Sequence, residues 1–488
     1  MPGIVVTTSV RTGPVNAQTA ATATMFVVGR TDRGPDGSSH MVSSISDYED
    51  IFGGYISGGY THQTIETFFE EGGARAYVSR VVDADAVEAG LSLSDGTATC
   101  MSLLASGTGT WANAGANAAG LSAEVVHVSA SASFKVKVRL NGAIVYTTQT
   151  HTSAADAVDE INDSPVAALY VTAATGAGTG IPVVIGLTYF SGGTNGGAIV
   201  DLDVNTALDT FTSNLGPGAV CAPGFTSETV RNYLLTHAEA NRRIAIMAFD
   251  KDTSASTAIA EVTDHSNLSN AQFGAFFFPW VKIPNGNLTR TIPPEGYVCG
   301  VRAKVHNTYG SWNPYAGERT ESKFVTDVYA SLSKEQAELL DDGFVNAIRV
   351  INDTVRVYGA RSASDDADNY RFIIAREVLN QIVHEAEQSL EALLFLPIDG
   401  RSSTFARVAS TLTALMERIR AGGGLFESYG ANGKQIDPGY TVQVNNANNP
   451  LSQLSQGVIK AKVGARVSSI GDTIEVEITK SNLTASLV

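Results

Sequence analysis

Apolar and polar residues alternate with a period of two over residues 347–351 and again over 354–358, with Asn352 and Asp353 between them. Alternation of this kind predicts two strands, and a short polar pair between them predicts the tight turn of a β-hairpin. Asn-Asp is a weaker turn signal than Asn-Gly, because only glycine takes positive φ without steric cost.

Two helical patterns follow this hairpin. Apolar residues recur at spacings of three and four over 370–396, before Pro397, and again over 403–420, before Gly422–Gly424. Such stripes predict amphipathic helices. Strand patterns then return at 440–444 and 458–467. We interpret residues 346–471 as a C-terminal α+β domain of ordinary size.

An α/β pattern precedes this region on both sides of a long insertion. Buried-type strands alternate with helices before residue 83, and the same alternation resumes after residue 206. Ser227 is placed to cap one helix, and Ser333 with Gln336 forms a capping box on another. Because two β-α-β units separated by an insertion suggest one parallel sheet, we expect a split α/β core domain made of residues 23–83 and 206–345.

Residues 84–205 differ in composition, because charges are sparse and Ala, Gly, Ser and Thr dominate. Alternating residues 134–140, then Asn141-Gly142, then residues 143–146 predict a type I′ hairpin. Segments 166–172 and 181–190 are further strand candidates. The segment is therefore interpreted as an inserted β-rich domain.

The two ends read as extended arms, residues 1–22 and 472–488. For residues 1–22 the alternatives are a frayed terminus and a strand that completes a sheet in a neighbouring subunit. For residues 472–488 they are an edge strand within its own domain and a strand that completes a sheet in a neighbouring subunit. The candidate contact residues of the inter-subunit interpretation are Ile4, Val5, Val6, Ile474, Val476 and Ile478.

Composition narrows the class of protein. The chain has 488 residues and a net charge of −16, so a nucleic acid is not an expected partner. Its three cysteines are too few and too far apart for a disulfide framework. The first residues lack a secretory signal pattern, and the densest apolar stretch, 273–281, is too short for a bilayer and contains Pro279. We expect no membrane insertion and assembly in a cytoplasm.

No catalytic motif is complete. His384 begins a sequence like that of a zinc-protease helix, but Gln388 stands where the second histidine is needed. Residues 426–430 miss a nucleophile elbow because Phe426 replaces the first glycine. We therefore predict no catalytic residue, no cofactor and no metal, while an α/β hydrolase-type enzyme stays open as a less favoured alternative.

Several blocks resemble the contractile phage tail sheath proteins. Residues 64–82 read TIETFFEEGGARAYVSRVV, residues 351–361 read INDTVRVYGAR, and residues 292–303 read IPPEGYVCGVRA, in the order of that family. Residues 310–317 depart from it, because Trp312 is kept while the usual lysine is absent.

This resemblance implies a structural subunit that polymerises helically, as stacked hexameric rings, around a tail tube protein. It also implies baseplate and tail terminator proteins as partners, an inner sheath layer formed by residues 346–471, and an exposed, variable insertion. Contraction would drive the tube through a host envelope for genome delivery, and the protein would lie in the virion. A sheath of a tail-derived injection system or bacteriocin is the alternative.

Adding a chelator is expected to leave the melting temperature unchanged, because no cluster of residues in the sequence has metal-ligand spacing. Thermal melting with and without EDTA measures this. A drop of several degrees on chelation would reveal a structural metal.

Overall fold

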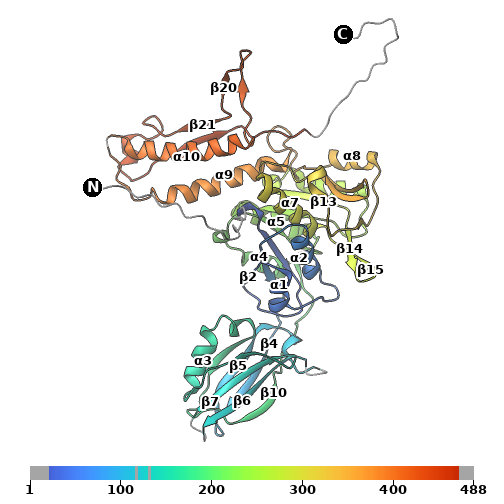
Figure 1. The fold of residues 1–488 in the computed structure, drawn as a ribbon, viewed down its shortest axis with the longest axis vertical. Coiled ribbons are helices and arrows are strands. Elements are labelled where there is room, and N and C mark those ends of the chain that lie inside the picture. The colour runs from blue at the N-terminus through green and yellow to red at the C-terminus, as the bar shows by residue number, and fades with distance from the viewer. Residues whose placement is uncertain (1–20, 116–118, 130–132, 400, 472–488) are drawn as a thin grey trace, which may run out of the picture.

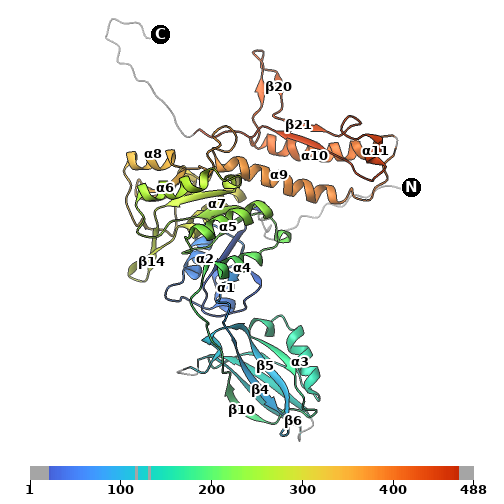
Figure 2. The same cartoon turned by 180° about the vertical axis from the view of Figure 1, so that it is seen from behind.

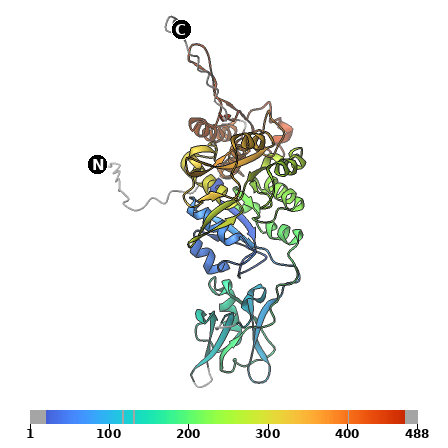
Figure 3. The ribbon, with the colours of Figure 1, turned by 90° about the vertical axis from the view of Figure 1, so that its right-hand side faces the viewer.

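The computed structural model describes residues 21–115, 119–129, 133–399 and 401–471. They form an elongated molecule with three parts along its long axis (Figure 1). The insertion lies at one end, a large sheet with its helices occupies the middle, and the long helices α9 (Ile373–Glu391) and α10 (Ser403–Ala421) lie across the other end, as the reverse view also shows (Figure 2). The side view shows the same stacking (Figure 3).

An eight-stranded sheet forms the middle of the molecule, in the order β18-β17-β13-β12-β11-β1-β3-β2. Strands from β17 to β3 in this order run parallel, while the edge strands β18 and β2 are antiparallel to their neighbours. The strands are β1 (Met25–Gly29), β2 (Ser39–Val42), β3 (Ala76–Arg80), β11 (Ala219–Cys221), β12 (Ile244–Met247), β13 (Gly274–Phe278), β17 (Val345–Ile351) and β18 (Thr354–Tyr358).

Helices cover both faces of this sheet, which is why its inner strands are apolar without alternation. Every residue of β1 and of β13 is buried. One face packs on α1 (Ile45–Phe52), α2 (Thr61–Glu70) and α7 (Glu295–Tyr309). The other packs on α4 (Asp201–Asp209), α5 (Glu228–Asn241), α6 (Ala255–Ser266) and α8 (Lys334–Asp342). The predicted caps on α5 and α8 are present.

The hairpin β17–β18 belongs to the central sheet and not to the C-terminal helices, which corrects the expected division at residue 346. Its turn is as predicted, with Asn352 and Asp353 both left-handed at φ 51° and 60°. However, β17 pairs in parallel with β13, Val345 beside Phe276. Both faces of β17 are buried, because Ile348 lies in the core on one side of the sheet and Ala347 lies in the core on the other side. The strand therefore lies in the interior of the sheet.

The described residues of the insertion form two sheets and one α-helix around a single core. The sheets have the orders β10-β6-β7-β8 and β4-β5-β9. Asn141 and Gly142, at φ 51° and 83°, form the predicted left-handed turn. The elements are β4 (Glu88–Ser94), β5 (Thr99–Thr108), β6 (Leu121–Ser129), β7 (Ser133–Leu140), β8 (Ala143–Thr147), α3 (Ala154–Asp163), β9 (Val171–Thr175) and β10 (Ile185–Tyr189).

The structure changes one boundary of the insertion and the start of one strand within it. The expected limit at residue 205 falls inside α4, whose Val204 and Leu208 pack in the central core. The strand expected over 166–172 begins at Val171, because residues after Pro165 form a short 3-10 helix, Ala167–Leu169. Helix α3 was not predicted, since its apolar face consists mainly of alanines and valine.

Smaller elements complete the described chain. A three-stranded sheet of β15 (Leu288–Ile292), β14 (Val281–Asn285) and β16 (Asp327–Val328) extends from the central sheet. The C-terminal part adds β19 (Ser428–Tyr429), β20 (Gln435–Asp437), β21 (Tyr440–Gln443), α11 (Leu451–Leu454) and β22 (Lys462–Ala465). Within the described ranges, no helix is both long and apolar enough to cross a membrane.

Helix α7 is buried along most of its length and carries an unusual carboxyl group at its start. Glu295 is 2% exposed, and its Oε2 accepts no hydrogen bond from the described residues. Burial raises the pKa of Glu295 from its ordinary 4.5 to about 7. The folded protein therefore prefers the protonated carboxyl.

Replacing Glu295 with glutamine should remove a pH dependence of stability. Because the folded pKa lies above the unfolded one, the stabilisation is complete below pH 4.5 and is lost as the pH rises through about 7. From pH 4.5 to 8 the wild type should lose about 3 kcal/mol of unfolding free energy relative to Glu295→Gln. Urea unfolding of both proteins across this range measures it, and a constant difference would contradict the burial argument.

Candidate assembly interface

The C-terminal layer, defined as α9, α10, β21 and β22 with their connections, has its own apolar core. Helices α9 and α10 pack together, and the ribbon β21–β22 covers α10. The buried members of this core are Ile374, Val378, Ile382, Leu415, Met416, Ile419 and Leu425. The predicted helices and strands therefore lie together as their apolar stripes require.

Trp312 joins this layer to the chain that follows α7. Its ring lies so close to the glycines after α10 that a Cβ at Gly422 would come within 2.3 Å of the ring, and one at Gly424 within 2.9 Å of the Trp312 Cβ. Glycine is thus required here for close packing as well as for ending the helix. The structure gives a reason for a tryptophan and a glycine run more than a hundred residues apart in the sequence.

The ribbon β21–β22 has strand edges without partners among the described residues. Tyr440 pairs with Ala465 and Gln443 with Lys462, and no further strand joins this sheet. One face packs on the layer through Tyr440, whose hydroxyl donates to Glu417. A two-stranded sheet is marginally stable alone, and its unpaired N–H and C=O groups form a template for an added strand.

Large apolar side chains are also exposed in this layer. At the turn after α9, Phe395 is fully exposed with a left-handed φ of 63°, and Leu394 is 62% exposed. A non-glycine residue with this backbone is uncommon. Other exposed apolar residues lie near the ribbon and on the hairpin β19–β20: Phe426, Tyr429, Ile436, Leu451 and Val458. These exposed apolar side chains are candidates for contacts with other chains.

A buried ion pair joins the C-terminal layer to the central part. The Arg302 guanidinium on α7 donates to both Glu377 oxygens on α9, at 2.6 and 2.7 Å. Both side chains are at most 2% exposed. Arg302 also donates to the Thr22 carbonyl at 2.6 Å, and His306 Nδ1 lies 3.2 Å from the Thr22 hydroxyl. Burial and the charge of Arg302 lower the pKa of His306 well below its ordinary value, so this imidazole is neutral at pH 7.

The start of the described chain is connected to this layer through α7, and the end of the described chain packs on the layer itself. Thr22, near the start, is held by Arg302, which is bound to α9. Ile470, near the end, packs against the core of the layer. The predicted contact residues themselves lie outside the described residues: Ile4, Val5, Val6, Ile474, Val476 and Ile478.

The sequence analysis missed Arg302 and Glu377 as a pair. A signal for each was present, since Arg302 interrupts the apolar stretch 297–303 of α7 and Glu377 adjoins the apolar stripe of α9. A charged residue inside a buried pattern needs a partner of opposite charge. The separation of 75 residues hides which partner that is.

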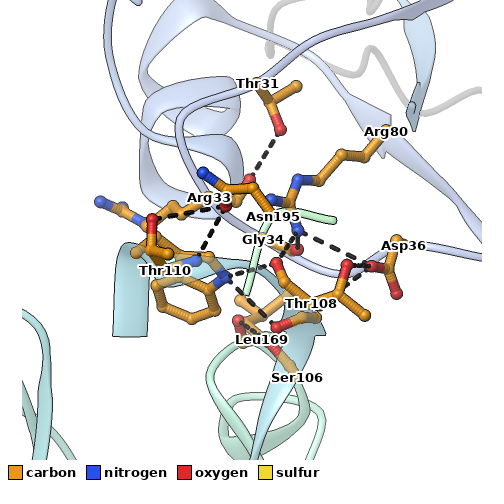
Figure 4. Close-up of polar contacts among 12 residues, drawn as sticks. Thr31, Arg33, Gly34, Asp36, Arg80, Ser106, Thr108, Thr110, Leu169 and Asn195 are labelled. Atoms are coloured by element: carbon orange, nitrogen blue, oxygen red, sulfur yellow. Dashed lines mark hydrogen bonds and ion pairs between the residues drawn. The ribbon is translucent and has the colours of Figure 1, made fainter. Parts of the chain in front are cut away.

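The insertion is fixed to the central part by a polar junction (Figure 4). Arg80, at the end of β3, donates from Nη1 to the carbonyl oxygens of Gly34 at 2.9 Å and Thr108 at 2.8 Å. Asp36 lies 3.8 Å from the same guanidinium and accepts from the Thr108 backbone N–H at 2.9 Å. On the returning chain, Asn195 accepts from the Thr110 N–H at 2.9 Å. These bonds orient the insertion.

The described residues offer little for catalysis. No group of three or more His, Cys, Asp and Glu side chains among them could hold a metal ion. A cavity of about 410 Å³ is an open hollow between the start of α9 and residues 465–469. Neither the cavity nor its lining brings a nucleophile and a base together.

The comparisons with known proteins give a family match for part of the chain. A family model described as "Phage tail sheath protein central domain" matches residues 197–363. No curated protein matches the chain by sequence.

Solved structures are similar over most of the chain. The sheath tail protein of Listeria innocua has a TM-score of 0.59 at 15% identity, covering 87% of this chain and 89% of its own. The helical sheath of the anti-feeding prophage in its contracted state has a TM-score of 0.57 at 15% identity, covering 98% and 99%. The contracted PVC sheath of an extracellular contractile injection system has a TM-score of 0.57 at 14% identity, also covering 98% and 99%. At these identities the likeness is one of fold.

Replacing Glu377 with glutamine should destabilise the protein strongly, because it leaves the Arg302 charge buried without a counter-charge. The expected cost is about 3–5 kcal/mol of unfolding free energy. Urea unfolding measures it.

Glu385→Gln is the matched control, on the same helix. Glu385 pairs with Arg418, whose side chain is 58% exposed, and an ion pair of this kind contributes about 0–1 kcal/mol. Equal losses in the two variants would show that the buried pair has no special role.

Proposed function

We propose that this chain is a structural subunit of a contractile sheath, because residues 197–363 match the model of the phage tail sheath protein central domain. The subunit polymerises helically around a tail tube. Contraction of the sheath drives the tube through a cell envelope. The observation that supports this most is the ribbon β21–β22, whose edges have no partner strand among the described residues. It lies in the layer on which the end of the described chain packs and to which the start is connected through Arg302.

In this proposal the terminal arms of neighbouring subunits add strands to the ribbon. The N-terminal arm contributes Ile4, Val5 and Val6, and the C-terminal arm contributes Ile474, Val476 and Ile478. Such a contact joins different surfaces of two copies, so it does not close on itself and propagates a helix. Backbone hydrogen bonds supply the affinity, and the alternating apolar side chains set the register.

The energetics of one arm are close to balanced. Burial of three aliphatic side chains contributes about 5 to 8 kcal/mol. About six ladder hydrogen bonds add roughly 6 kcal/mol. Ordering an arm of about seven residues costs about 7 to 14 kcal/mol. A single arm is therefore a weak link, and several arms held at once in a lattice give a stable tube.

Contraction needs no bound fuel in this proposal. The sequence has no complete nucleotide-binding motif, so the work is stored in the assembled state and released by a baseplate trigger. Subunits would move as rigid bodies while the arms keep them linked. The buried pair of Arg302 and Glu377 suits this, because it ties the C-terminal layer to the central sheet.

We further propose which parts meet which partners. The C-terminal layer forms the inner surface and meets the tail tube protein, with the exposed Phe395 and Leu394 at its tip. Baseplate and tail terminator proteins cap the two ends of the stacked hexameric rings. The insertion lies on the outside, and the central sheet is the domain between them.

Two settings fit this role. One is a phage tail, in which the sheath serves genome delivery and the protein is part of a virion. The other is a phage-tail-like injection system or bacteriocin, favoured by the similarity in fold to sheaths of two such systems. Capsid genes beside the coding gene would assign the chain to a phage.

Deleting residues 1–20 or 472–488 should abolish tubes without unfolding the subunit, because in this proposal the arms link subunits and contribute little to the monomer core. Electron microscopy of the purified proteins and their melting temperatures measure the two effects. Full-length protein that forms no tubes or stacked rings would oppose the sheath role itself.

The two deletions also test the arms separately. If the C-terminal deletion lowers the melting temperature steeply, that strand belongs to its own subunit. Regular tubes from either truncated protein would show that the deleted arm is not the linkage.

A further inference from the structure

The basic side chains of the insertion lie on one face of one strand. Between residues 84 and 200 the sequence has three lysines and arginines, Lys135, Lys137 and Arg139, against eight acidic residues. They alternate along β7 with Phe134, Val136 and Val138, which are buried in the core of the insertion. Because successive side chains of a strand point to opposite faces, all three cations point outward.

The outer face of the sheet β10-β6-β7-β8 is partly exposed, since Lys135, Lys137 and Arg139 are each half-buried. Across this face Arg139 pairs with Ile144, which is 51% exposed, and Lys135 pairs with Val126. Among the described residues, Glu124 is the one carboxylate that contacts the cations, at 3.4 Å from Lys137 and 3.2 Å from Arg139. Lys135 makes no ion pair with any described residue. The face is thus mixed apolar and cationic.

Helix α3 carries the opposite charge on a different side of the same part. Asp156, Asp159 and Asp163 follow at spacings of three and four, so they share one helix face, and all three are exposed. None of them forms an ion pair within the described part of the chain. Helix α3 buries Ala157 and Ile161 in the same core as β7.

The two charged faces cannot meet within one subunit. Both elements direct their apolar sides into one core, so their outer faces point away from each other, and α3 and β10 lie on opposite sides in both ribbon views (Figures 1 and 2). The Arg80 junction holds the insertion in a fixed orientation on the central part (Figure 4). A repeating assembly therefore presents each face in a constant direction.

We propose that the outer face of the β10-β6-β7-β8 sheet of one subunit docks on the acidic face of α3 of a neighbouring copy. This rests on the proposed function, since it requires a lattice of copies. The contact is head-to-tail, like the arm linkage, so the two can repeat together along one helix. It gives the insertion a role as an electrostatic contact between neighbours, whose strength falls as salt rises.

The test uses two matched charge reversals in the full chain: Lys135→Glu with Arg139→Glu, and Asp159→Lys with Asp163→Lys. Lys137 is kept so that Glu124 retains a partner. Each variant alone places like charges at the contact. The fraction of protein that sediments as tubes at about 0.05 M salt should fall about threefold or more, and the loss should disappear near 1 M salt, where the Debye length is about 3 Å.

Mixing the two variants separates a contact between copies from an effect within one chain. In an equal mixture, the reversed sheet of one variant meets the reversed α3 of the other, so tubes should return to the wild-type level. The chain with all four substitutions should also assemble normally. If each variant alone loses tubes and neither the mixture nor the fourfold variant restores them, the proposed pairing is wrong.

The outcome is separable from that of the sheath proposal. Wild-type tubes that are unaffected by either reversal would overturn the docking contact and leave the sheath role intact. Melting temperatures of the variants show whether each variant is folded, so that a loss of tubes is not mistaken for misfolding. Should Arg139→Glu unfold the insertion through Glu124, Lys135→Glu alone against Asp159→Lys repeats the test, because neither residue forms an ion pair within the described structure.

Discussion

The buried ion pair of Arg302 and Glu377 is the interaction on which the arrangement of the molecule depends. Two charges removed from water are tolerated only when each meets the other and when their remaining hydrogen-bonding groups are also satisfied. Arg302 meets this condition with a bidentate carboxylate and a backbone carbonyl. It thereby joins three segments that the sequence keeps apart: the start of the described chain, the buried helix α7, and α9.

The insertion is attached in a different way. Its link to the central sheet consists of Arg80 with backbone carbonyls and Asp36, and of hydrogen bonds between the two connecting segments, such as that from the Gly197 N–H to Asp83. Polar links of this kind fix direction with little apolar burial. A part attached like this can vary in composition without disturbing the central core, which fits its sparse charge and its abundance of small residues.

The C-terminal layer presents the opposite problem, a structure that is complete in its core and incomplete at its edge. Its ribbon is short, its outer residues are polar, and its inner face is anchored by Tyr440. Short polar edges limit unspecific pairing while leaving room for a matching strand. The proposed arms would supply that strand, so the same edge would serve both solubility of the subunit and order in the assembly.

The sequence by itself determined the local elements wherever one face is strongly apolar. Helices α9 and α10, the hairpin turn at Asn352-Asp353 and the turn at Asn141-Gly142 follow from periodicity and from residues that tolerate left-handed backbone. The blocks that resemble sheath proteins also followed from the sequence. The sequence analysis did not predict helices α3 and α4, because their alanine-rich or polar sequences give weak periodic signals.

Only the tertiary structure decided which elements share a core and which charges meet. Hairpin β17–β18 carries the same local pattern whether it covers two helices or extends a sheet, and pairing with β13 decides between them. Likewise, the sequence indicates that a buried Arg302 needs a counter-charge, whereas only the fold shows that Glu377 supplies it. The physical reason is that periodicity records which face of an element is buried, whereas partners are chosen by burial and electrostatics between segments that the chain holds far apart.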